Sequence, residues 1–157
     1  MNDATALAAP AATGIRALWN RVADALSAFL SQDLLALVSR FALAAIFFLS
    51  GRTKVDGFLT VTEGTYTLFR EEFKVPVLPP EFAAHMATYA EHLFPVLLAI
   101  GLLTRLSALG LLGMTAVIQV FVYPDAWATH LSWAAIALYL VGRGAGRASA
   151  DHALGIR

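Results

Sequence analysis

Ionisable side chains stand inside otherwise apolar stretches of this sequence, where proton or ligand chemistry would need them. Arg40 and Glu91 each lie several residues from the ends of such a stretch, and three histidines, His85, His92 and His130, lie in two of these stretches. A carboxyl or imidazole group in a polar cavity can exchange a proton or hold the polar part of a ligand. A site is therefore expected where the elements that carry these residues meet.

The composition assigns the chain to the class of membrane proteins. Of its 157 residues 59% are apolar and 14% are charged, and its mean hydropathy is +0.68. Soluble domains carry about a quarter charged residues. Zero formal net charge and the lack of a dense basic run exclude nucleic-acid binding. The absence of cysteine excludes thiol chemistry and cysteine-ligated metal sites within this chain.

Four stretches are long and apolar enough to cross a bilayer. A span needs roughly 17 to 25 mostly apolar residues, and the candidates are about 34–51, 82–103, 106–123 and 126–142. Only two residues separate the second span from the third and the third from the fourth, so these neighbours must run antiparallel. The expected fold is all-α, an integral membrane four-helix bundle.

The segments outside the spans complete the expected organisation. Residues 1–32 form an N-terminal tail and an amphipathic helix, 33–143 hold the four spans, and 144–157 form a C-terminal tail. The amphipathic helix either lies flat on the membrane surface or packs on the bundle. The long connection 52–81 is expected to contain a short helix around 61–73, and it either serves function or simply caps the bundle.

Positive charge near the span ends sets the expected orientation. With four spans both termini lie on one side, which carries six of the basic residues against four on the other: Arg16, Arg21, Arg105, Arg143, Arg147 and Arg157 against Arg52, Lys54, Arg70 and Lys74. Because basic loops stay inside, both termini are expected in the cytoplasm and the 52–81 loop outside.

Arg40 and Glu91 are expected to form an intramembrane polar pair. A charge near the bilayer centre costs roughly 2.5 to 3.5 kcal/mol even on the lenient insertion scale. Both residues fall in the middle third of their spans, so their charges could neutralise each other. The pair would either fix helix register or line a polar cavity in which Glu91 takes a proton or holds a ligand.

Polar and aromatic groups from three spans also converge near the outer surface. They could receive a quinone head group, with aromatic rings packing on it: His92, Gln119, Tyr123, Trp127, His130 and Trp133. Alternatively, copper or zinc could be held by His85, His92, His130 and Asp125. The histidine spacing matches no HxxxH or HExxH pattern.

Several short motifs carry a family resemblance through their order and spacing. They are Arg40-Phe41, Phe48-Leu49-Ser50-Gly51-x-x-Lys54, Glu91-x-x-x-Pro95-x-x-Leu98-x-x-Gly101-Leu102-x-Thr104-Arg105, Gln119-x-Phe121-x-Tyr123-Pro124-x-x-Trp127-x-x-His130-x-x-Trp133 and Ser149-x-Asp151-His152. Across about residues 40–154 the chain resembles the DoxX family of small four-span membrane proteins. The resemblance implies a multi-pass protein of the bacterial inner (plasma) membrane.

The resemblance also implies a role beside redox systems. Members of the family look like membrane partners of quinone-dependent sulfur oxidation, of thiol or oxidative-stress complexes, or of metal-stress proteins. The family's recurring polar positions correspond here to Arg40, Lys54, Glu91, Arg105, Gln119, His130 and Asp151. No catalytic motif is carried over, and we do not expect an enzyme acting on its own.

These observations favour an accessory or anchoring subunit of a redox module that binds a quinone in a polar intramembrane pocket. One alternative is a membrane component of a copper or metal-stress system that uses the histidines near the outer face. Another is a structural scaffold that recruits a partner. The expected partners are the lipid bilayer and a membrane or periplasmic redox protein, with self-association left open.

Overall fold

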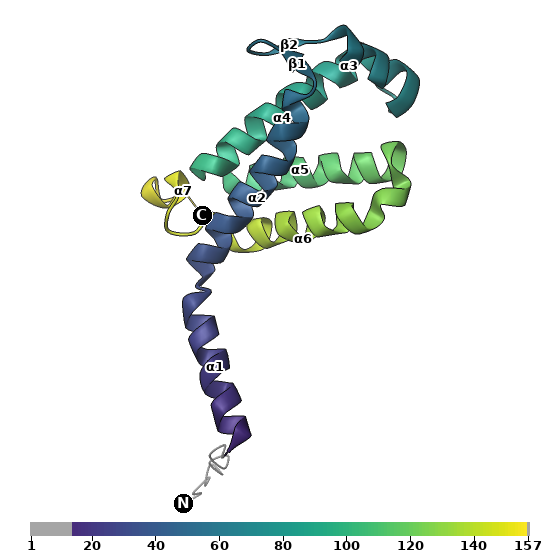
Figure 1. Ribbon diagram of the computed structural model, residues 1–157. Coiled ribbons are helices and arrows are strands. Elements are labelled where there is room, and N and C mark those ends of the chain that lie inside the picture. The colour runs from purple at the N-terminus through teal and green to yellow at the C-terminus, as the bar shows by residue number, and fades with distance from the viewer. Residues whose placement is uncertain (1–13, 157) are drawn as a thin grey trace, which may run out of the picture. The chain divides into compact units, whose positions relative to one another are not determined.

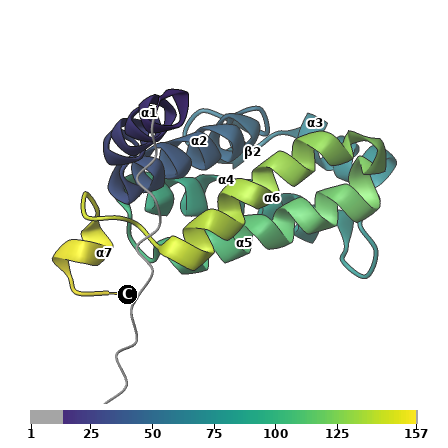
Figure 2. The same ribbon diagram turned by 90° about the horizontal axis from the view of Figure 1, so that it is seen from below.

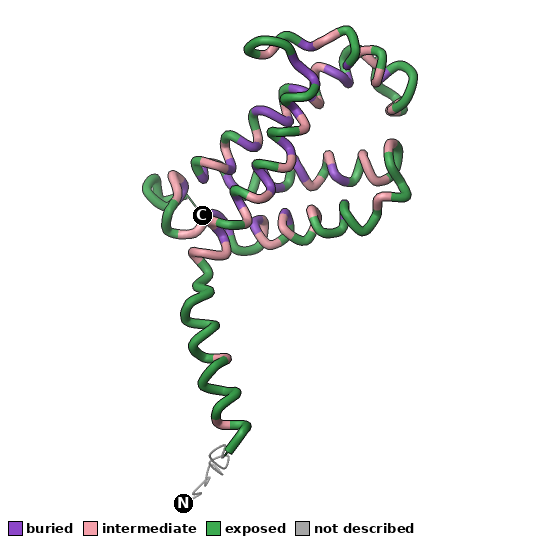
Figure 3. The backbone as a smooth tube through the Cα atoms, in the orientation of Figure 1, coloured by how far each residue is buried: buried purple, intermediate pink, exposed green. Residues whose placement is uncertain are grey.

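The structure, a computed structural model, describes residues 14–156, which are mostly helical. They divide into two compact units, one ending at Ser31 and the other beginning at Gln32. The first unit is the helix α1 (Ile15–Phe29), in which no residue is buried (Figure 3). Its apolar residues are therefore all accessible. The helix was predicted; its placement at a membrane surface stays a prediction, and the tail 1–13 lies outside the described residues.

Four long helices form most of the second unit. They are α2 (Gln32–Arg52), α4 (Pro80–Ile100), α5 (Thr104–Val117) with its π-helical continuation η2 (Ile118–Val122), and α6 (Trp127–Arg143). A 3₁₀ turn, η3 (Pro124–Ala126), joins η2 to α6. The helices begin and end within a few residues of the predicted spans.

These helices pack around one shared core. α2 contacts α4 and α6, and α5 contacts the same two helices (Figures 1 and 2). The core is made of buried apolar side chains from all four, among them Leu43, Phe47, Leu98, Leu111 and Leu140. Close van der Waals packing across this shared face holds the helices together.

Two of these helices are long and apolar enough to cross a membrane. They are Gln32–Arg52 and Thr104–Val122, at two of the four predicted span positions. α4 carries His85, Glu91 and His92, which lower its hydropathy, and α6 has only 17 residues. The four-span topology therefore remains a prediction for α4 and α6.

The connection between α2 and α4 is more structured than the sequence predicted. A short antiparallel hairpin, β1 (Val55–Asp56) and β2 (Thr60–Val61), pairs Val55 with Val61 and precedes the expected helix. That helix consists of α3 (Glu63–Leu68) and the π-helical turn η1 (Phe69–Phe73). η1 packs against α4 and η2, so the connection covers one end of the helices.

The predicted C-terminal tail folds back onto the helices. It contains the short helix α7 (Ala150–Ala153), whose Asp151 carboxylate accepts hydrogen bonds from the backbone N–H groups of Leu103 and Thr104 at 2.7 and 2.9 Å. These N–H groups lie at the start of α5, where a helix leaves donors unsatisfied. Asp151 therefore caps α5 and anchors the C-terminal segment to the α4–α5 turn.

Candidate functional site: a cavity between the long helices

A buried ion pair joins Lys54, two residues beyond the end of α2, to Glu91 in the middle of α4. Lys54 Nζ lies 2.7 Å from Glu91 Oε2, and the two side chains are 9% and 5% exposed. Ser50 Oγ donates to Glu91 Oε1 at 3.2 Å and accepts from Lys54 Nζ at 3.0 Å. The carboxylate thus has a partner on each oxygen, as a buried charge requires.

Arg40 does not pair with Glu91, so that prediction was wrong. Its guanidinium donates instead to four backbone carbonyls, those of Leu98, Ala99, Ala145 and Ala148, at 2.7–3.0 Å. The carbonyls of Leu98 and Ala99 belong to the last turn of α4, where a helix leaves acceptors unsatisfied.

The antiparallel register of α2 and α4 explains the error. A Cβ added at Gly51 would lie 3.0 Å from the Glu91 Cβ, so Glu91 faces the end of α2 and not its middle. Gly51 is 11 residues beyond Arg40 in the sequence, which at about 1.5 Å per residue is roughly 16 Å along the helix. Similar depth in each span was therefore insufficient to bring the two charges together.

The ion pair lies at the wall of a cavity of about 490 Å³. Apolar side chains dominate its lining, and they come from α2, η1, the segment between η1 and α4, α4, α5, η2 and α6: Ile46, Phe47, Phe69, Phe73, Val75, Leu78, Met86, Phe94, Met114, Val117, Ile118, Val122 and Trp133. The polar groups at its wall are those of Ser50, Lys54, Glu91, Tyr123 and His130. An apolar cavity with a few convergent polar groups is typical of small-molecule sites.

The predicted outer pocket is only partly assembled at this cavity. Tyr123, His130 and Trp133 line it, whereas His92, Gln119 and Trp127 do not. Trp127 is 63% exposed. His92 is buried, with its Nδ1 bonded to the Thr88 carbonyl at 2.7 Å and its ring edge against Phe48.

Gln119 acts on the cavity through His130. Gln119 Nε2 donates to the Pro124 carbonyl at 2.7 Å, so its Oε1 faces His130 Nδ1, also at 2.7 Å. An amide oxygen only accepts, and therefore Nδ1 carries the proton of the neutral ring. His130 Nε2 is then an acceptor, and no hydrogen bond to it is found within residues 14–156. The network leaves His130 Nε2 free to accept a hydrogen bond.

Tyr123 closes the rim between η1 and η2. Its hydroxyl donates to Glu72 at 2.7 Å, and its ring packs edge-on against Phe73 with centroids 5.7 Å apart. The hydrogen bond to the Glu72 carboxylate, followed by burial, raises the pKa of the Tyr123 hydroxyl above its usual value. The neutral phenol therefore holds the loop over the cavity.

The predicted metal ligands are not brought together. His85 bonds to the Tyr66 hydroxyl and to the Glu81 carbonyl, while His92 and His130 have the separate partners given above. Across the described part of the chain, no three histidine, aspartate or glutamate side chains are grouped as a metal site. Asp125 is exposed.

Sequence reasoning missed Lys54 and Ser50 as partners of Glu91. Lys54 was counted only as a charge at the outer end of a span and as a position shared with a family. That position was the available signal, because Lys54 follows Gly51 by only three residues, in the turn directly after α2, and Gly51 is the residue of α2 that meets Glu91. No pattern in the sequence indicated that Phe69 and Phe73, in the connection between α2 and α4, line the cavity.

The sequence profile of the DoxX family matches residues 35–124, more than half of the chain and most of the cavity lining. This chain belongs to the DoxX family. It is also similar to an uncharacterized protein of Haemophilus influenzae, with 31% identity over 125 residues that cover 73% of this chain and 80% of that protein. No solved structure matches it. Membership of the DoxX family places the chain among membrane-associated proteins.

Proposed function

We propose that this DoxX protein crosses the bacterial inner membrane four times and binds one quinone in the cavity at the Lys54–Glu91 pair. The observation that carries the proposal is the cavity itself, in which one buried ion pair and one histidine acceptor interrupt an aromatic and aliphatic lining. A quinone has the matching chemistry, since its ring is flat and apolar and its carbonyl oxygens accept hydrogen bonds.

The residues at the cavity wall fit such a ligand. Lys54 would donate to one quinone oxygen in place of its 3.3 Å hydrogen bond to the Ser50 carbonyl, and the acceptor Nε2 of His130 would receive a hydrogen bond from the reduced, hydroxylated form. Phe73, Phe94 and Trp133 would pack on the ring and on the first part of its isoprenoid chain. The role of the chain is then to hold the quinone for a redox partner, in the membrane or periplasm, that supplies the electrons.

Occlusion of the cavity tests the proposal without disturbing its polar groups. Gly113 lies on α5 at the cavity wall, and a Cβ added there would meet nothing within 4 Å. Gly113→Leu should fill the cavity. Because leucine forms helix better than glycine does, the substitution should also stabilise α5 by up to about 1 kcal/mol. The assay is equilibrium binding of decylubiquinone to the full chain in mild detergent. We expect Gly113→Leu to bind decylubiquinone at least tenfold more weakly than the wild type.

Gly142→Leu is the matched control. Gly142 is also helical, a Cβ there also meets nothing within 4 Å, and the residue lies outside the cavity lining. This variant should bind decylubiquinone like the wild type. Equal binding by the wild type and Gly113→Leu would overturn the proposal, and so would the absence of saturable binding to the wild type. Retention of a partner protein by a wild type that binds no quinone would favour the scaffold reading.

A further inference from the structure

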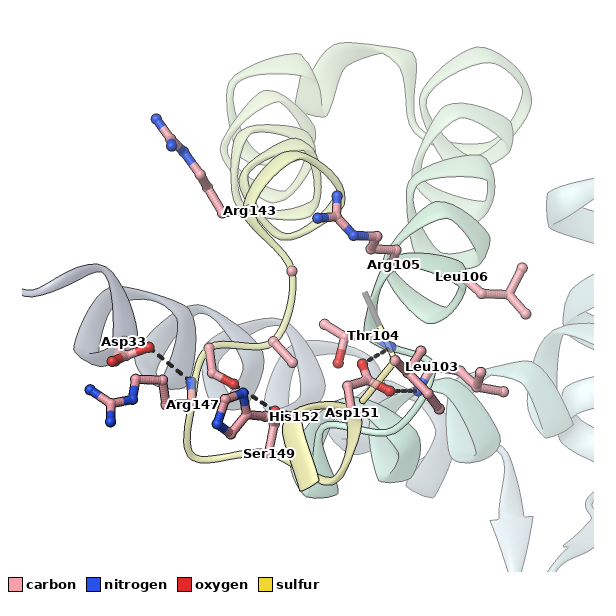
Figure 4. A pocket seen from close by; sticks show the side chains of 14 residues that line it. Asp33, Leu103, Thr104, Arg105, Leu106, Arg143, Arg147, Ser149, Asp151 and His152 are labelled. Atoms are coloured by element: carbon pink, nitrogen blue, oxygen red, sulfur yellow. Dashed lines mark hydrogen bonds between the residues drawn. The ribbon is translucent and has the colours of Figure 1, made fainter. Parts of the chain in front are cut away.

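A second cavity of about 490 Å³ lies at the opposite end of α2, beside the α4–α5 turn. Three arginines line it, Arg105 from α5, Arg143 from the end of α6 and Arg147 from the following loop (Figure 4). His152 of α7 lines it as well. This basic groove, defined by these four residues, is separate from the cavity at Lys54 and Glu91, whose lining shares no residue with it.

Arg105 presents an open edge to the basic groove. Its Nη1 is bonded to the carbonyls of Val141 and Gly142, which close the last turn of α6. Its Nε and Nη2 have no acceptor among the residues that the structure describes. A Cβ at Gly144 would lie 3.5 and 3.6 Å from Nη2 and Nε, so the glycine keeps this edge clear. Two parallel N–H groups of an arginine match the oxygens of a phosphate group.

The other two arginines are uncommitted. The Arg143 side chain makes no hydrogen bond or ion pair within the described chain, and the Arg147 residue is held only by its backbone N–H, which donates to Asp33 at 2.8 Å. The two carboxylates of the groove are engaged, since Asp33 receives this bond and Asp151 caps α5. Three arginines against two aspartates leave the groove with an excess of positive charge, counting His152 as neutral.

The rest of the lining suits an amphiphile. Leu103, Leu106 and Ile156 are 42%, 60% and 40% exposed at the edge of the groove. The hydroxyl of Thr104, which also lines it, is buried without a hydrogen-bond partner in the described residues. Exposed leucines beside arginines favour a ligand that has both an acyl chain and a charged phosphate.

We infer that the basic groove binds the phosphate of an anionic phospholipid. Arg105 and Arg143 contact the phosphate oxygens, Arg147 supplies further positive charge, and the acyl chains lie along Leu103 and Leu106. The inference rests on the membrane location proposed above but not on the quinone. Gly113→Leu should therefore leave lipid binding unchanged, so that failure of one proposal is distinguishable from failure of the other.

The test compares three probes on the full chain purified in an uncharged detergent. Native mass spectrometry and thermal unfolding are measured with dioleoyl-phosphatidylglycerol, with dioleoyl-phosphatidylcholine and with inorganic phosphate. Phosphatidylglycerol should bind with a saturable rise in Tm, whereas phosphatidylcholine should bind at least tenfold more weakly. Inorganic phosphate at millimolar concentration should give no rise in Tm. A response to phosphate equal to that with phosphatidylglycerol would overturn the assignment to a lipid.

The double variant Arg143→Gln/Arg147→Gln tests the residues. Neither side chain holds the fold through a hydrogen bond, so the variant should fold. It should bind phosphatidylglycerol at least tenfold more weakly, because two of the three arginines that attract the phosphate lose their charge. Arg52→Gln/Arg70→Gln removes the same charge outside the groove and should bind like the wild type. Equal losses in the two double variants, or none in the first, would overturn the inference.

Discussion

The Lys54 ammonium group and the Glu91 carboxylate lie 2.7 Å apart, and both side chains are more than nine-tenths buried. The pair ties the segment just after α2 to α4 at the wall of the cavity between the long helices. A buried pair of this kind contributes little net stability, but the loss of one partner leaves an uncompensated charge. The free energy of coupling between Lys54 and Glu91 can therefore be measured with a double-mutant cycle.

Glu91→Leu should destabilise the protein by about 3 kcal/mol or more, since it leaves the Lys54 charge buried. The double variant Lys54→Met/Glu91→Leu should lose clearly less than the sum of the two single variants, with a coupling of at least about 1 kcal/mol. Thermal or denaturant unfolding in detergent measures the cycle. Arg40→Met combined with Glu91→Leu is the control and should be additive, because these residues share no partner. Additive losses for Lys54 and Glu91 would contradict the pair.

Gly101→Ala should be strongly destabilising. Gly101 ends α4 with φ +71°, a left-handed conformation that costs an L residue about 1–2 kcal/mol. The added Cβ would also lie 2.6 Å from Ser149 Cβ and 2.8 Å from Arg40 Cζ, so the C-terminal segment would have to move. Gly142→Ala, with open space around it, should change Tm little. A Gly101→Ala variant with the Tm of the wild type would show that the turn is not packed in this way.

Arg40→Lys should loosen the C-terminal segment. A lysine ammonium group has three donors on one atom and cannot span the carbonyls of both α4 and residues 145–148 as the guanidinium does. Trypsin should then cleave after Arg143 or Arg147 several times faster than in the wild type. Arg52→Lys on the same helix is the matched control, because Arg52 contacts only exposed carbonyls. Cleavage at the rate of the wild type would argue against the role given to Arg40.

The pKa of the Tyr123 hydroxyl should lie above the usual pKa of tyrosine. Its pKa is raised by the bond to Glu72, so the stabilising contact is complete below the pKa of the unfolded chain and is lost as the pH rises through the folded pKa. The ultraviolet difference titration between the wild type and Tyr123→Phe isolates this hydroxyl. A Glu72→Gln variant should bring the midpoint back down. A midpoint at the ordinary value in the wild type would mean that the rim contact is absent.

Hydropathy and linker length were enough to locate the four long helices. The apolar stretches mark where the helices lie, and the two-residue linkers mark where they end. α1 lies in the segment where an amphipathic helix was predicted, and its amphipathic role stays a prediction. The hairpin at Val55 and Val61 was missed, since strands of two residues leave no alternation to detect.

The partners of the buried charges were harder to predict. Depth along a span says how far a residue lies from the membrane surface, but the register between α2 and α4 decides which residues face each other. The sequence also offered no way to know that carbonyls at 145 and 148, in a segment read as a tail, would satisfy Arg40. In contrast, Gln119 and His130 were expected near one another and are hydrogen-bonded.

The engagement of Arg40 has a consequence for how the protein is made. Two of its four acceptors, the carbonyls of Ala145 and Ala148, lie 105 and 108 residues later in the chain. During synthesis the Arg40 guanidinium lacks half of its four acceptors until residues 145–148 have been translated. The middle of α2 therefore reaches its final contacts only after α6 and the segment that follows it have been made.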